Sequence, residues 1–184
     1  IYDKVMRVKS ISEALVSLLS IDNETASKIM RAVMLSKTDL DTAMVYEFAS
    51  LQGHIGRIYA LNEGEDKEVA EAINDQYKPR FSGDSIPTAM VSIVVSLSEK
   101  IDNIFGSFSV GNIPKGSQDP YALRRQANAI VDIIIRNGLK FQLVDVLKAV
   151  SSNYRDGFSL IGKIIDFVNG RARTIFTEAG FRYD

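Results

Sequence analysis

The stretch MVSIVVSLSEKIDNIF, residues 90–105, decides the fold class. Its apolar residues recur every three or four positions, which is the spacing of one face of an α-helix and not the strict alternation of a half-buried strand. The pattern therefore predicts a long buried helix. Its predicted buried stripe consists of Met90, Ile93, Val94, Leu97, Ile101 and Phe105.

The same periodicity continues on both sides of this stretch, while strand-like alternation does not compete with it. A segment with two prolines and a glycine, residues 78–87, breaks the pattern and predicts a loop. Asp22 is placed to cap one helix, and Asp119 followed by Pro120 is placed to begin another. We therefore predict an all-α protein of about seven to nine helices. Besides the central one, they cover roughly residues 8–18, 22–35, 40–49, 52–61, 63–77, 119–137, 142–150 and 161 to the C-terminal region.

Composition excludes several classes of protein. The chain has 184 residues, 22 Lys and Arg against 23 Asp and Glu, a single histidine and no cysteine. Disulfides and thiolate metal sites are thereby excluded, and any nucleic-acid contact has to come from a local patch because the net charge is −1. No signal peptide and no apolar run of the roughly 20 residues that a membrane span needs is visible. Because the first residue is isoleucine, we expect a fragment of a longer chain.

The loop and helix start NIPKGSQDPYALRRQAN, residues 112–128, is the most basic local feature. Leu123, Ala127, Ile130 and Ile134 form the predicted buried stripe of the helix, and two arginines in its second turn are not explained by the helix dipole. Arginine's planar fork suits phosphate oxygens. One interpretation is a structural salt bridge to another helix; the other is a phosphate-binding patch. The patch candidates are Lys115, Arg124 and Arg125, with Lys78 and Arg80 as helpers.

Catalytic constellations are mostly absent, and we predict neither catalytic residues nor a metal site. His54 is the only histidine, so a Ser-His-Asp arrangement would have to use it, and a lone histidine before a helical segment is typical of a surface or capping residue. Asp39, Asp41, Glu47 and Asp102 leave a carboxylate-only metal site open, although scattered carboxylates are usually solvated surface groups.

Four blocks resemble the β subunit of bacterial heterotetrameric glycyl-tRNA synthetase. They contain a Leu-Gln-Gly sequence at 51–53, a Tyr-Lys-Pro-Arg-Phe loop at 77–81 and the distinctive block 99–128. A later arginine-rich block runs from Phe167 to Asp184, and the four blocks occur in order over most of positions 38–184. The chain departs from the family pattern at Glu99, where Asp is common, at Gln118, where Lys is common, and at Gln126, where Ala is common.

The resemblance implies a specific role. Such a β subunit mainly recognises tRNA(Gly), while a separate α subunit holds the aminoacylation site and uses ATP and Mg²⁺, in a cytoplasmic enzyme expected to be α2β2 without membrane attachment. The fragment itself is expected to need no cofactor and to be inactive alone. The resemblance also implies an HD-like helical fold with a core at about 22–140 and additional C-terminal helices at about 141–184, within a single all-helical region.

Two alternatives remain open at this stage. The first is a purely architectural domain that assembles the α and β subunits without touching tRNA. The second is a working HD-type phosphohydrolase, for which Asp39 and Asp102 would be remnants of metal positions. Such a site normally combines several histidines with aspartates, and the chain supplies one histidine.

Overall fold

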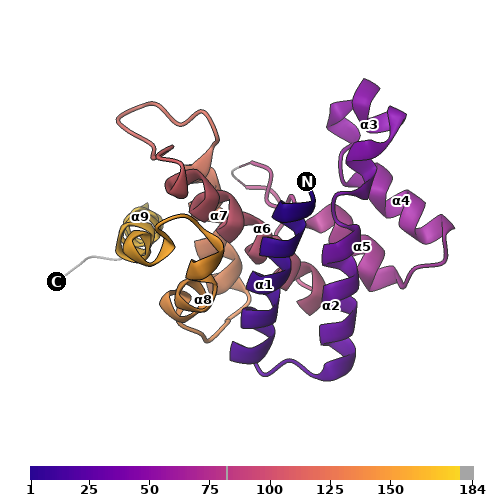
Figure 1. Cartoon of the computed structure of the whole chain (residues 1–184), viewed down its shortest axis with the longest axis horizontal. Helices are drawn as coiled ribbons and strands as arrows, with labels where there is room; N and C mark the ends of the chain where they lie inside the picture. Colours follow the sequence, from indigo (N-terminus) through magenta and orange to yellow (C-terminus); the bar gives the residue numbers. More distant parts are fainter. Residues whose placement is uncertain (82, 179–184) are drawn as a thin grey trace. The chain divides into compact units, whose positions relative to one another are not determined.

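The computed structural model describes residues 1–81 and 83–178, and its regular structure is helical (Figure 1). Over the described residues the only β-type pairing is an isolated bridge between Lys115 and Gln118, so the predicted all-α class is confirmed. The HD-like part of that prediction stays a prediction. The α-helices are α1 (Tyr2–Leu18), α2 (Asn23–Leu35), α3 (Ala43–Glu47), α4 (His54–Asn62), α5 (Lys67–Asp75), α6 (Met90–Ser109), α7 (Leu123–Arg136), α8 (Leu143–Val150) and α9 (Gly157–Glu178), and the 3-10 helices are η1 (Thr38–Asp41), η2 (Ala49–Leu51) and η3 (Ser151–Asn153).

The chain divides into two compact units, Ile1–Glu99 and Lys100–Asp184. The boundary falls inside α6, which contributes its first half to one unit and its second half to the other. This division is different from the predicted core of about 22–140 with C-terminal helices at 141–184, and those predicted limits stay a prediction. Residues 179–184, at the end of the last family-like block, lie outside the described part.

The first unit is a set of helices packed in sequence. Helix α1 packs on α2, α2 packs on α5, and α4 packs on α5. The predicted cap at Asp22 is confirmed, because its carboxylate accepts a hydrogen bond from the backbone N–H of Thr25 at 2.9 Å. Asp66 caps α5 in the same way, accepting from the N–H of Glu68 at 2.7 Å. These caps satisfy N–H groups that a helix start leaves without an intrahelical partner.

The predicted helical piece at 40–49 is present but broken into short elements. The chain there forms η1, the five-residue α3 and η2 in succession. The reason is that Asp39 turns inward and its Oδ2 accepts a hydrogen bond from the N–H of Gly53 at 2.6 Å. Thr42 then starts α3 afresh, accepting from the N–H of Val45. Gly53 has φ of 82°, a conformation that favours glycine, and precedes α4.

The second unit packs α7 and α8 on α9. The Phe105 ring of α6 stacks on the Tyr154 ring, with centroids 4.0 Å apart and an interplanar angle of 6°. The Tyr154 hydroxyl donates a hydrogen bond to Asp102 Oδ1 at 2.8 Å, so the polar end of this buried tyrosine is satisfied. An aromatic side chain and a carboxylate thus join the η3–α9 connection to α6.

Helix α6 confirms most of the predicted stripe. Residues 91–102 are all buried, whereas Met90 at the first position is 37% exposed, so its predicted place in the buried stripe is wrong. In α7, Leu123, Ala127 and Ile130 are buried as predicted, while Ile134 is only half-buried and Ile133 is fully buried instead. Within the described part of the chain, no helix is both long and apolar enough to cross a membrane.

Candidate nucleic-acid contact site

The loop between α6 and α7 starts the second helix differently from the sequence prediction. The helix begins at Leu123, three residues after Pro120, because Ala122 adopts a left-handed conformation with φ of 52°. Asp119 still caps it: its two carboxylate oxygens accept hydrogen bonds from the N–H groups of Leu123 at 2.8 Å and Arg124 at 2.9 Å. The Asp119 side chain therefore satisfies the first N–H groups of the helix as a cap does, but the N-cap position is Ala122, and the predicted helix start at Pro120 is wrong.

This start moves the two arginines into the first turn of α7, whereas the sequence pattern predicts the second. Arg124 is half-buried, and its guanidinium donates a hydrogen bond to the carbonyl oxygen of Gly116 at 2.7 Å, which closes the loop on itself. Arg125 is exposed, and so is Lys115 in the same loop. Because the N-terminus of a helix disfavours cations, the Asp119 carboxylate offsets the charge of Arg124 and Arg125 there.

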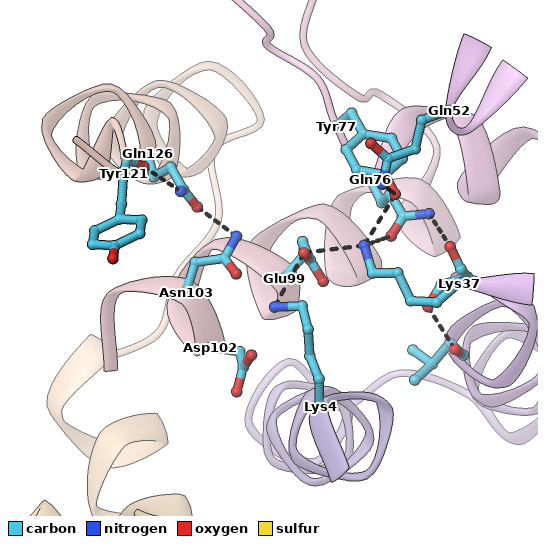
Figure 2. A network of polar contacts seen from close by, with 12 residues as sticks. Lys4, Lys37, Gln52, Gln76, Tyr77, Glu99, Asp102, Asn103, Tyr121 and Gln126 are labelled. Carbon is cyan, nitrogen blue, oxygen red and sulfur yellow. Dashed lines mark hydrogen bonds and ion pairs between the residues drawn. The ribbon is translucent and has the colours of Figure 1, made fainter. Parts of the chain in front are cut away.

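The loop also lines an open pocket of about 240 Å³. Lys115 lines it together with Pro114, Pro120 and Tyr121, and Tyr121 is 55% exposed. The backbone of Tyr121 is anchored from α6 in two steps (Figure 2): the Asn103 amide donates to the Gln126 side-chain oxygen at 2.8 Å, and the Gln126 amide donates to the Tyr121 carbonyl at 3.4 Å. The pocket therefore combines a cation, an aromatic ring and a fixed backbone.

Lys78 and Arg80, the two predicted helpers, lie in the other unit. Lys78 pairs with Asp75 at 2.9 Å, one turn back along the chain. The Arg80 guanidinium donates to the carbonyl of Gln52 at 3.2 Å and lies 5.6 Å from the centre of the Tyr77 ring. The structure thus brings Lys115, Arg124 and Arg125 into one loop and helix start, and it does not bring Lys78 and Arg80 to them within a single unit.

The first unit holds a second polar constellation, a buried network centred on Lys37 (Figure 2). The Lys37 ammonium lies 3.1 Å from Glu99 Oε1, donates to Gln76 Oε1 at 2.7 Å and is 3.1 Å from the Tyr77 hydroxyl. Lys4 approaches the same Glu99 oxygen at 3.2 Å. Burial raises the pKa of the Glu99 carboxyl, but the two cations outweigh burial and hold its pKa below the usual value.

The neighbouring Tyr77 keeps its proton in this network. Burial, followed by the negative charges of Glu99 and Asp39, raises the pKa of the Tyr77 hydroxyl. A neutral phenol can accept from Lys37 and from the Gln52 amide, which lies at 2.8 Å. The network therefore places a carboxylate and neutral polar groups around the buried Lys37 ammonium, and these partners offset the cost of burying its charge.

Comparison with known proteins decides the family. The family model described as "Glycyl-tRNA synthetase beta subunit" matches residues 1–184. The chain belongs to the glycyl-tRNA synthetase beta subunit family. Two similar relatives are glycine–tRNA ligase beta subunits, one from Halothermothrix orenii, 45% identical over 99% of this chain, and one from Desulforamulus reducens, 41% identical over 100% of it. A third, from Histophilus somni, is 38% identical over 99% of it. The chain spans only 27%, 28% and 26% of these relatives' own lengths.

In this member of the glycyl-tRNA synthetase beta subunit family, the candidate metal positions have other roles. The interpretation of Asp39 as a surface carboxylate is wrong, because it is 1% exposed and binds the Gly53 N–H. Asp102 is also buried, and it accepts from Tyr154 within the second unit. His54 is exposed at the start of α4. Over the described residues, no three His, Cys, Asp or Glu side chains gather in a way that would hold a metal ion.

Sequence patterns in this family member do not reveal the polar residues that matter most inside the two units. Lys37 meets Gln76 over a separation of 39 residues, and Asn103 reaches Gln126 over a separation of 23. The one available signal is a charged residue within an apolar helical run, as at Glu99. The departure from the family pattern at Gln126 marks a residue that in this chain anchors Tyr121.

Proposed function

We propose that the chain is part of the β subunit of a glycine–tRNA ligase, supporting recognition of tRNA(Gly) during ATP-dependent glycylation. The match of the family over all 184 residues carries this proposal. The catalytic α subunit would supply the aminoacylation site with ATP and Mg²⁺, in a cytoplasmic enzyme of α2β2 composition. The chain alone is expected to be inactive.

The α6–α7 loop is the proposed tRNA contact. Lys115 and Arg125 are exposed on it, and Arg124 braces it through Gly116. The N–H groups of Leu123 and Arg124 are already bonded to Asp119, so phosphate oxygens would be held by side chains and not by the end of α7. Each cation that neutralises a phosphate releases condensed counterions, which makes the contact sensitive to salt.

The test replaces Lys115→Gln and Arg125→Gln together in the intact α/β enzyme. Arg124 is left in place because its loss would open the loop. We expect weaker tRNA binding and a shallower dependence of log K on log salt, by roughly 1 for each lost phosphate contact. ATP–glycine activation by the α subunit should not change.

The matched control is Lys140→Gln with Lys148→Gln, which removes the same charge from exposed positions of the same unit. It should leave tRNA affinity and its salt dependence close to those of the wild type. If the control weakens binding as much as the loop variant, the effect is one of overall charge and the loop proposal is wrong. If the loop variant unfolds at a lower temperature and binds tRNA normally, these side chains are structural.

A second candidate function is subunit assembly, and one observation favours it. Helix α3 and the residue after it expose Met44, Tyr46 and Phe48, with Tyr46 86% and Phe48 58% exposed. Exposed large apolar side chains this close together along the chain are typical of protein contact surfaces. The acidic Asp41 and Glu47 beside them disfavour a phosphate backbone. If α3 contacts protein, the loop variant described above leaves co-purification of the α subunit unchanged.

A hydrolase function has no comparable support. An HD-type metal site combines histidines with carboxylates, whereas Asp39 and Asp102 are engaged with Gly53 and Tyr154, in different units. The proposed role is therefore recognition and assembly within a synthetase, with chemistry left to the partner subunit.

A further inference from the structure

The pocket in the α6–α7 loop has walls of a particular chemistry. Pro114 and Pro120 supply rigid apolar surface, Tyr121, a residue that is 55% exposed, supplies an aromatic ring, and Lys115 supplies a cation. The side chains of Asn112 and Gln118, which also line it, are amides that both donate and accept hydrogen bonds. Proline surface, an aromatic residue and amide side chains in one pocket suit a planar polar ring.

Three sets of hydrogen bonds hold the residues around the pocket in place. Asp119 is fixed by the N–H groups of Leu123 and Arg124, and Arg124 is fixed to Gly116. Gln126 carries the Asn103 hydrogen bond on to the Tyr121 carbonyl, and Figure 2 shows the Tyr121 ring pointing away from the Gln126 amide. Because the backbone of Tyr121 is already fixed, a ligand that stacks on its ring does not have to order the loop, which favours binding.

We propose that this pocket takes one unpaired nucleobase of the bound RNA, stacked on Tyr121, with the adjoining phosphate at Lys115. The volume of about 240 Å³ is below the range of about 300–1,000 Å³ typical of whole small-molecule ligands, so a single planar ring is the right size. A base inside a duplex is covered on both faces and cannot enter, whereas unpaired bases are commonly recognised by stacking on aromatic side chains.

Charge favours RNA over a peptide as the occupant. The loop and first turn of α7 carry Lys115, Arg124 and Arg125, and the one carboxylate there, Asp119, is occupied by backbone N–H groups. The inference rests on the proposed tRNA contact of this loop and adds to it the kind of nucleotide that is bound. Neutralising a phosphate makes binding depend on salt, whereas stacking on Tyr121 does not. The salt dependence of binding therefore distinguishes the stacking contact from the phosphate contact.

The experiment measures tRNA binding by the intact α/β enzyme carrying Tyr121→Leu or Tyr121→Trp. We expect Tyr121→Leu to weaken binding at least about fivefold with an unchanged salt slope, because stacking on an aromatic side chain contributes about 1–3 kcal/mol per base. Tyr121→Trp should bind like the wild type. The matched control is Tyr2→Leu, an exposed tyrosine in the other unit, which should have no effect.

Three outcomes of the binding measurements overturn the inference. If Tyr121→Leu binds tRNA normally while the Lys115→Gln, Arg125→Gln variant binds it weakly, the pocket holds no base but the loop still contacts tRNA. If neither variant weakens binding, the tRNA contact and the base pocket are both wrong. If Tyr121→Leu impairs α-subunit association and leaves tRNA affinity unchanged, the occupant is a peptide.

Because Tyr121→Leu is open to a folding defect, ultraviolet crosslinking of the wild-type enzyme to tRNA provides an independent test. A crosslink from Tyr121 to an unpaired nucleotide supports the inference, and its absence overturns it.

Discussion

Lys37 illustrates how this fold keeps a charge inside. The residue is 5% exposed, yet its ammonium group has Glu99 at 3.1 Å, Gln76 at 2.7 Å and the face of the Tyr77 ring at 4.6 Å. Removing an ion from water costs several kcal/mol, and only a partner of opposite charge with matched hydrogen bonds offsets that cost. Removing one partner of the Lys37–Glu99 pair should therefore destabilise the fold, even if the intact pair contributes little net stability.

Substituting Glu99→Gln tests this residue-scale argument. Gln has nearly the same shape but no charge, so Lys37 loses its buried counter-charge, and we expect a loss of about 3–5 kcal/mol in the free energy of unfolding at pH 7. Because the folded-state pKa of Glu99 is lowered, its contribution is fully present above the ordinary value of 4.5 and is lost as pH falls through the lowered folded-state value. The difference between wild type and variant should thus shrink as the pH is lowered through that window.

Denaturant unfolding at several pH values measures that difference. The control is Glu13→Gln, which removes a carboxylate from the exposed pair between Lys9 and Glu13. Exposed pairs contribute less than about 1 kcal/mol, so this change should be small at every pH. A Glu99→Gln variant as stable as the wild type at pH 7 would show that the network does not stabilise the fold.

At the scale of elements, periodicity predicts the long helices and misses the features set by distant contacts. Helices α6 and α9 follow from their apolar stripes, because burial of one face is a local pattern. The break at 38–53 depends on the bond from Gly53 to Asp39, and the start of α7 depends on an alanine with φ of 52°. Alanine gives no signal for that conformation, whereas glycine or asparagine would.

The candidate contact site is also only partly predictable from the sequence. Lys115, Arg124 and Arg125 stand out because basic residues cluster within a short span of sequence. Tyr121 does not, because its anchoring by Asn103 through Gln126 joins two helices. A contact of that kind has no local sequence pattern.

Two glycines in helices provide an element-scale prediction. A Cβ on Gly56 in α4 would lie 2.8 Å from Ile73 Cγ2 of α5 and 3.1 Å from Asp39 Oδ2. We therefore expect Gly56→Ala to lower the free energy of unfolding by about 1–3 kcal/mol through overpacking. Gly162 in α9 is exposed, and a Cβ added there would have nothing within 4 Å, so Gly162→Ala should be neutral or stabilising by up to about 1 kcal/mol.

Urea unfolding of the two variants provides the measurement, with the wild type beside them. The difference between the two effects is the informative feature, since both changes add the same methyl group within a helix. Equal effects of the two substitutions would contradict the close approach of α4 to α5 at Gly56.

At the scale of the whole molecule, charge and ligand supply restrict what the chain can do. Its 22 basic and 23 acidic residues nearly cancel, so attraction to a polyanion is confined to local patches such as the α6–α7 loop. With one histidine and no cysteine, the usual donors for a transition metal are scarce. Stability should therefore come from the packed helices without a metal ion.

Chelation tests this expectation. A metal that binds the folded state raises the unfolding temperature, so its removal lowers it. We expect the unfolding temperature of the chain to be the same with and without EDTA, and to be unchanged after stoichiometric Zn²⁺ or Mg²⁺ is added. A drop with EDTA that one equivalent of metal reverses would contradict the prediction of no metal site.

The stacked pair of Phe105 and Tyr154 should give the second unit a signal of its own in near-ultraviolet circular dichroism. The chain contains no tryptophan, so its near-ultraviolet circular dichroism arises from seven tyrosines and nine phenylalanines. A tyrosine held at 4.0 Å and 6° from a second ring, with its hydroxyl fixed on Asp102, sits in a rigid and asymmetric environment. Such a ring contributes strongly to a signal that disappears when specific packing is lost. Tyr154→Phe would remove this contribution and leave a spectrum whose tyrosine bands report the remaining tyrosines alone.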